Sequence, residues 1–188
     1  MLIHIILSLL LSYPTTPTVS YDCTTLYDGI DVKTKLYRKE LAPEYFFSYS
    51  PAELKNELKT HNLMTVDAQA SKIESNQYLN LNIHMYSAQA TKIYGTIEAQ
   101  SKMVITTIYG REIELLNRAR SIPVLTNDPE VNIYVVSFEL DKSSVKRLSS
   151  EEIDKVGIEW SSGYEEYTIY EVDFLKHCLL YTSDAADE

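Results

Sequence analysis

The chain has 188 residues, of which 45% are hydrophobic and 23% charged, with two Cys and a formal net charge of −10. This composition excludes a disordered acidic tail, a collagen-like repeat and a disulfide-dense miniprotein, because the apolar content is ordinary and cysteine is scarce. The acidic balance excludes nonspecific nucleic-acid binding, which depends on Lys and Arg at the phosphates. We expect one strand-rich domain, since the 15 Tyr pack best on pleated sheet faces.

The N-terminal segment differs in composition from the rest of the chain. Residues 1–11 are almost wholly apolar, and residues 12–20 are polar and rich in Pro. An apolar core of about ten residues is too short to cross a bilayer and is typical of a secretory signal. We therefore expect residues 1–20 to be a signal peptide, the protein to be secreted, and no stable membrane insertion. A buried first strand is the alternative for this segment.

The C-terminal segment is set apart for another reason. Residues 178–188 resemble the in-frame translation of a sequencing adapter and are interpreted as a non-native tail. On this interpretation residues 21–177 form one domain whose own C-terminus is missing. Cys23 is then the only native thiol, so it is either free or paired with a cysteine in the missing segment.

The first predicted elements are a strand and a helix. Residues 30–38 alternate and predict a first strand that ends in the region of Pro43. Residues 50–53 read Ser-Pro-Ala-Glu, a capping box with Pro at the first helical position. They predict a helix that runs to about Thr60.

The middle of the chain predicts alternating element types. Residues 80–86 are ambiguous by periodicity, and the alanines that follow at 88 and 90 favour a short helix. Residues 103–109 are a β-branched run closed by Gly110 and predict a strand. Residues 112–120 have apolar side chains at helical spacing and predict a helix.

The last third predicts mostly strands. Residues 131–138 are the clearest buried strand, residues 152–153 are expected to open a helical turn, and residues 164–174 alternate like another strand. The whole predicts a mixed α+β domain without internal repeats.

Motifs that carry chemistry are few. The histidines at positions 61, 84 and 177 lie at no metal-ligand spacing from Cys or another His, so no metal site is expected. No G-x-S-x-G occurs, and Cys23 has no base near it in the sequence, so nucleophilic hydrolase motifs are absent.

The order of several segments, however, resembles a toxin family. The segments are Leu36-Tyr37-Arg38, residues 79–86, residues 104–109, residues 133–136 and residues 163–167. Their order and spacing are similar to those in the A subunits of cholera toxin and heat-labile enterotoxin, and more distantly in the S1 subunit of pertussis toxin. The resemblance covers residues 36–174.

What the resemblance implies is a mono-ADP-ribosyltransferase with NAD as its substrate. The implied fold has two small packed β-sheets around a cleft for NAD, with flanking helices. The implied reaction breaks the nicotinamide glycosidic bond through an oxocarbenium-like transition state, which negative charge stabilises, and transfers ADP-ribose to an acceptor protein. A receptor-binding subunit is a possible further partner.

The resemblance assigns roles to five residues. Arg38 would bind the NAD phosphate, and Thr106 and Thr107 would lie beneath the nicotinamide. Glu166 would hold the ribose 2′-hydroxyl and stabilise the ribosyl cation. Tyr164 stands two positions earlier on the same strand face, where the family has a second carboxylate or amide, so modification of arginine acceptors is not implied.

Each of these residues also has a purely structural interpretation. Arg38 would be an exposed strand arginine lying over a neighbouring Tyr, the threonines would be packing residues, and Glu166 would be a solvated acid on an edge strand. Glu165 points to the opposite strand face and cannot replace Glu166. The alternative function is therefore a secreted, noncatalytic β-rich binding module, or an inactive descendant of the same fold. Clustering of Arg38, Thr107 and Glu166 around one cleft favours the enzyme, and their dispersal removes the case for it.

Overall fold

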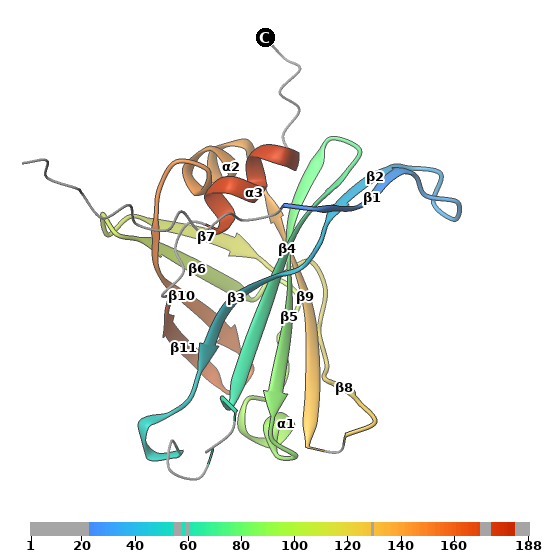
Figure 1. Ribbon diagram of the computed structural model, residues 1–188. Helices are drawn as coiled ribbons and strands as arrows, with labels where there is room; N and C mark the ends of the chain where they lie inside the picture. The colour runs from blue at the N-terminus through green and yellow to red at the C-terminus, as the bar shows by residue number, and fades with distance from the viewer. Residues whose placement is uncertain (1–22, 55–57, 59–60, 129, 170–173, 183–188) are drawn as a thin grey trace, which may run out of the picture.

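Three long strands with alternating side chains form the centre of the fold. They are β4 (Met64–Ile73), β5 (Asn76–Tyr86) and β9 (Val131–Leu140), and they pair antiparallel in this order (Figure 1). The structure is a computed structural model that describes residues 23–54, 58, 61–128, 130–169 and 174–182. Along each strand buried and less buried residues alternate, which places one face of the sheet in the core.

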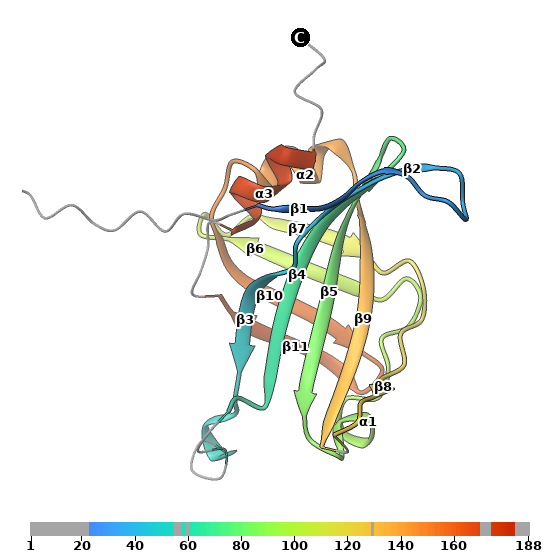
Figure 2. The same ribbon diagram turned by 45° about the vertical axis from the view of Figure 1, so that its right-hand side comes forward.

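Shorter strands complete this first sheet on both sides. They are β1 (Thr25–Ile30), β2 (Tyr37–Leu41), β3 (Glu44–Tyr49) and β8 (Val124–Leu125). The strand order is β1-β2-β4-β5-β9-β8, and β3 also pairs with β4. The β1–β2 ribbon projects beyond the body of the protein in both Figure 1 and Figure 2.

The second sheet has four strands in the order β11-β10-β6-β7, all antiparallel. They are β6 (Lys102–Thr107), β7 (Glu112–Leu116), β10 (Ile153–Trp160) and β11 (Gly163–Thr168). They lie behind β4, β5 and β9 in Figures 1 and 2 and cross them at a steep angle. The coarse α+β expectation of two packed sheets holds, whereas their arrangement around an NAD cleft stays a prediction.

The helices are few and short. They are η1 (Ala52–Leu54, a 3-10 turn), α1 (Ala90–Ile93), α2 (Lys142–Leu148) and α3 (Phe174–Thr182). The short helix predicted near residue 90 is confirmed. The helix predicted from Pro51 to Thr60 appears only as η1 among the described residues, and residues 55–57 and 59–60 lie outside them. Figures 1 and 2 place α2 and α3 at one end of the sheets and α1 at the other.

Two predicted strands are confirmed, and the first part of another predicted strand is a turn. The runs at 103–109 and 131–138 form β6 and β9, and the ambiguous run at 80–86 belongs to β5. The single strand predicted over 30–38 is wrong in its first part. Residues 31–36 form a turn between β1 and β2, because the Asp31 carboxylate accepts the backbone N–H of two residues that follow it.

The helix predicted over 112–120 is wrong, because this segment begins with strand β7. Its buried residues are Ile113 and Leu115, which alternate with exposed neighbours at the strand period of two. The turn before it joins β6 to β7 as a hairpin, and Gly110 there has φ +71°. The hairpin partner therefore overrides the helical spacing of the apolar residues.

Two further predictions near the C-terminus are wrong. Residues 152–153 open no helical turn, because strand β10 begins at Ile153, and the polar stretch after β9 is helix α2. Asp141 begins α2, since its side chain accepts the backbone N–H of Ser144. The strand predicted over 164–174 ends at Thr168, residues 170–173 lie outside the described residues, and Phe174 belongs to α3.

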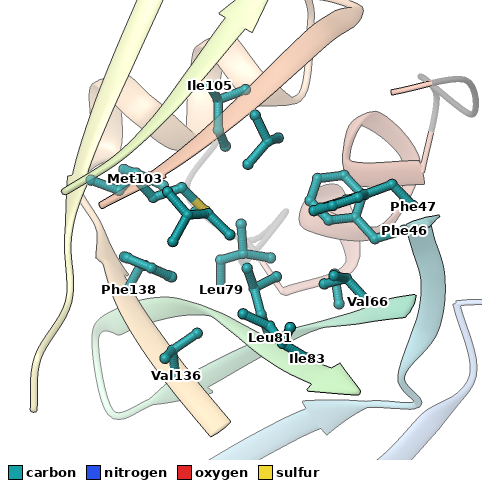
Figure 3. Close-up of a cluster of buried hydrophobic side chains, with 14 of the residues drawn as sticks. Phe46, Phe47, Val66, Leu79, Leu81, Ile83, Met103, Ile105, Val136 and Phe138 are labelled. Atoms are coloured by element: carbon teal, nitrogen blue, oxygen red, sulfur yellow. The ribbon is translucent and has the colours of Figure 1, made fainter. Parts of the chain in front are cut away.

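The core lies between the two sheets and draws side chains from both. Figure 3 shows Leu79, Leu81 and Phe138 of the first sheet facing Met103 and Ile105 of the second. All five are completely or almost completely buried. Removal of this apolar surface from water is the main contribution to the stability of the fold.

A disulfide joins the two ends of the described chain. Cys23 bonds to Cys178 on α3, at a sequence separation of 155 and with 5.3 Å between their Cα atoms. The expectation that Cys23 is free or pairs outside the chain is therefore wrong for this structure. The sequence does not predict this pairing, because Cys178 lies in the segment interpreted as a non-native tail. In the structure, both Cys178 and Leu179 of α3 are buried. Disulfides persist in oxidising compartments.

Candidate functional site

Arg38 lies on β2, close to the turn that joins β1 to β2, and its charge is already neutralised. Its guanidinium lies 4.6 Å from the ring centroid of Tyr27 and forms ion pairs of 3.4 Å with Asp31 and with Glu40. This arrangement matches the structural interpretation of a strand arginine lying over a neighbouring Tyr. An arginine with two carboxylates and a ring around it has little left to offer a phosphate.

Thr106 and Thr107 point to opposite faces of β6. Thr106 is half-buried on the outer face of the second sheet, next to Lys155 and Glu112 on the flanking strands. Thr107 points inward and is 1% exposed, and its hydroxyl has no hydrogen-bond partner among the described residues. Its hydroxyl therefore orients no described carboxylate.

Tyr164 and Glu166 share the outer, solvent-facing side of β11, as the strand period predicts. Glu166 accepts a hydrogen bond of 2.9 Å from Lys155, and this contact raises the pKa of Lys155. The Tyr164 ring lies over Gly157 and leaves no room there for a Cβ. The predicted catalytic pair thus lies on an open sheet face with its carboxylate neutralised.

The structure does not bring the predicted residues together. Arg38 on β2 pairs with Ile73, at one end of β4. The strand of the first sheet nearest to β11 is β3, and it pairs with β4 at Val66, which lies seven residues from Ile73. Seven residues of strand span about 24 Å. Thr106, Tyr164 and Glu166 share the outer face of the second sheet, Thr107 lies on its inner face, and Arg38 belongs to the other sheet.

A different carboxylate on β11 points between the sheets. Glu165, which alternates with Glu166, accepts a hydrogen bond of 2.9 Å from the hydroxyl of Tyr167. The Tyr167 oxygen in turn accepts a hydrogen bond of 3.1 Å from the indole N–H of Trp160 on β10. Tyr167 and Trp160 are buried, whereas Glu165 is only partly buried.

Aromatic rings from two other segments surround this chain of hydrogen bonds. The ring centroid of Tyr49 on β3 lies 5.1 Å from that of Tyr167, and Phe47 stacks on Tyr167 at 5.3 Å. Tyr94, just after α1, lies 5.2 Å from Trp160. We call Glu165 and its neighbours Tyr49, Tyr94, Trp160 and Tyr167 the Glu165 cluster. The cluster lies where the edge strands β3 and β11 approach each other (Figures 1 and 2).

Burial and the negative charge of Glu165 act together on the phenols of the cluster. Burial, with smaller contributions from the negative charge of Glu165 and from Tyr49, raises the pKa of Tyr94 to about 12. Burial first, and then the charge of Glu165, raise the pKa of Tyr49 and bring that of Tyr167 far above the ordinary range. All three phenols are therefore neutral at physiological pH and can donate or accept hydrogen bonds.

The Glu165 cluster was missed in the sequence for a definite reason. The family pattern directs attention to Glu166, and the strand period then places Glu165 on the other face. That other face is the one between the sheets, which the sequence does not reveal because both faces of β11 carry polar residues. The aromatic residues at 160, 164 and 167 were a usable signal, since two of them lie on the face of Glu165.

A separate cavity of about 320 Å³ lies between β7, β9 and the start of α2. Its lining is mostly polar and includes Glu114, Arg118, Glu139 and Asp141. Asp141 caps α2 and Arg118 lies over the ring of Tyr78, 4.4 Å from its centroid. None of the residues predicted from the sequence lines this cavity.

Within the described ranges, no group of three or more His, Cys, Asp or Glu side chains is arranged to hold a metal ion. None of the helices in the described part of the chain has the length and apolar character that crossing a membrane requires. Comparison of the chain with protein-family models, with curated proteins and with solved structures gives no match.

Proposed function

We propose that the protein is a secreted, noncatalytic binding module that receives its ligand at the Glu165 cluster. The observation that carries this proposal is the separation of Arg38 from Glu166. NAD chemistry of the expected kind needs a cation on the pyrophosphate and a carboxylate at the ribose of the same molecule. Here the two side chains belong to different sheets, and each is neutralised by neighbours of opposite charge.

Two observations support the exported location. The first is the apolar segment 1–11 with the Pro-rich stretch after it, and the second is the Cys23–Cys178 disulfide, which suits an oxidising compartment.

ADP-ribosyl transfer to an acceptor protein is the second candidate, and one observation favours it. Glu165, next to the expected Glu166, is a carboxylate that points between two packed sheets. A carboxylate in that position is the group that an oxocarbenium-like transition state requires.

An assay of nicotinamide release from NAD separates the two candidates. The binding module releases no nicotinamide above the buffer rate, and Glu165→Gln, Glu166→Gln and Arg38→Ala leave this result unchanged. Release that Glu165→Gln or Glu166→Gln abolishes, in a variant that folds like the parent by circular dichroism, establishes the enzyme and overturns the proposal.

A further inference from the structure

The Glu165 carboxylate has no positively charged partner among the described residues. Its neighbour Glu166 pairs with Lys155, and acids elsewhere pair with Arg111, Arg120 or Lys102, but Glu165 accepts only the hydroxyl of Tyr167. A cationic ligand would supply the counter-charge that this carboxylate lacks, so the charge of the site is itself an indication of what binds.

The oxygens around Glu165 can accept hydrogen bonds from such a ligand. The phenol oxygens of Tyr49 and Tyr94 make no hydrogen bond to another described residue, and both phenols stay neutral because their pKa values are raised. The ring of Tyr49 packs on that of Tyr167, the hydrogen-bond donor of Glu165, and the ring of Tyr94 packs on Trp160, which donates to Tyr167. Tyr49 and Glu165 are both partly exposed, which leaves them within reach of a ligand from solution.

The rest of the cluster sets the shape of the ligand. Trp160 and Tyr167 are 2% and 1% exposed and form an apolar layer behind the carboxylate. A small charged head bonded to an apolar stem suits such a site, because the head meets the oxygens and the stem meets the partly exposed ring of Tyr49. Glu53 adds a second negative charge near Tyr49, and the chain carries a net charge of −10, so cations are attracted over longer distances as well.

We propose that Glu165, together with Tyr49, Tyr94 and Tyr167, binds a primary ammonium group carried on an apolar stem. An ammonium has three N–H donors and no acceptor, which matches one carboxylate and two free phenol oxygens. The same chemistry is presented by a free alkylamine and by a lysine side chain of a partner protein. This inference rests on the proposed binding function, since it names the ligand class of the same site.

The single tryptophan of the chain is a direct probe of the site. Trp160 lies in the cluster, and no other Trp contributes to the fluorescence. We expect butylammonium to change Trp160 fluorescence saturably, and butanol, which has a similar stem without the charge, to leave it unchanged at equal concentrations. Choline, which has no N–H donor, is expected to bind at least tenfold more weakly than butylammonium.

Two neighbouring substitutions provide the matched comparison. Glu165→Gln removes the charge between the sheets and is expected to weaken butylammonium binding at least tenfold. Glu166→Gln makes the same chemical change one residue along, on the outer face, and is expected to change the affinity less than twofold. Tyr49→Phe, which keeps the ring and removes only the oxygen, is expected to weaken binding severalfold and serves if Glu165→Gln does not fold.

The source of the ammonium group is tested with Nα-acetyl-lysine methylamide in the same titration. Saturation by the lysine derivative at lower concentration than by butylammonium indicates a protein partner, and the reverse order indicates a free amine. Equal responses to butanol and butylammonium, equal affinities in the two Glu variants, or choline binding as tight as butylammonium overturn the inference. The nicotinamide assay remains independent of all these outcomes, so a failure here is distinguishable from a failure of the proposed function.

Discussion

Glu165 and Glu166 are adjacent in the chain and occupy two different environments. Glu166 is on the outer face of β11, half-exposed and paired with Lys155, whereas Glu165 faces the other sheet, with Tyr167 as its hydrogen-bond donor. The difference arises only from the strand period, which sends successive side chains to opposite faces. It teaches that a residue identified by a motif and its neighbour one position away can occupy opposite faces of a sheet. Four predictions test this contrast, in order of expected effect.

The largest expected loss of unfolding free energy follows from a substitution on the inner face of β11. Tyr167→Ala removes a buried ring that packs on Phe47 and Tyr49 and leaves the Trp160 N–H without its acceptor. Loss of a large buried aromatic side chain costs about 4 kcal/mol of unfolding free energy. Thr168→Ala, on the outer face at the next position, is expected to cost less than about 0.5 kcal/mol. Urea unfolding of both variants checks the contrast, and equal losses would refute it.

The second-largest effect is expected at alkaline pH, where the free energy of unfolding should fall because a phenol of the inner face ionises. The pKa of Tyr94 is about 12 in the folded protein against 10.0 for the ordinary group, so the folded state prefers the neutral phenol. The contribution of Tyr94 is therefore fully present below pH 10 and is lost as pH rises through 12. Two pKa units correspond to about 2 to 3 kcal/mol.

Unfolding free energies between pH 9 and pH 12 measure this loss. Tyr94→Phe has no phenol to ionise and should lose stability less steeply over this range than the parent. Tyr167 and Tyr49 add losses of the same sign in both proteins, because their pKa values are raised as well. Parallel pH profiles for parent and variant would show that Tyr94 titrates normally.

A smaller effect is expected where Tyr164 lies over Gly157 on the outer face. Gly157→Ala places a methyl group where the ring lies, so the exposed Tyr164 side chain must move away and lose this contact. We expect a cost of about 1 kcal/mol, since a ring over a strand glycine contributes that order of stability. Tyr164→Ala should make the two substitutions less than additive. Additive losses in a double-mutant cycle would mean that the ring and the glycine do not interact.

The smallest effect is expected for Glu166→Gln. Its ion pair with Lys155 is exposed on both sides, so water and salt screen it. The change in denaturation midpoint should be small in dilute buffer and absent in 1 M NaCl. A large loss that persists in high salt would place Glu166 in a tighter environment than an open sheet face.

The parts of the fold that could be predicted are those with one unambiguous burial pattern. The β-branched runs of β6 and β9 are buried and bounded by turn residues, so local sequence was sufficient. The segment of β7 was predicted as a helix because Ile113 and Leu116 are three apart, and only pairing with β6 selects the strand. Helix α2 was missed because its signal is a cap, Asp141, within a polar stretch.

The candidate site could be predicted only in part. Strand β11 and the shared face of Tyr164 and Glu166 followed from the two-residue period. Which face meets the other sheet did not follow from β11 itself, because each of its faces carries one Glu and one Tyr, and only Trp160 on the neighbouring strand favours the face of Glu165. Tyr49 lies on β3, Tyr94 just after α1 and Trp160 on β10, and tertiary packing alone brings them to Glu165.

The bond between Cys23 and Cys178 also decides how the protein responds to a protease. The tip of the β6–β7 hairpin carries Tyr109, which is 68% exposed and open to cleavage. A single nick there divides the backbone into two fragments, each contributing strands to both sheets. Because Cys23 in one fragment is covalently joined to Cys178 in the other, the nicked molecule migrates as one species until a reducing agent is added, and it re-forms its sheets without having to find a separate partner.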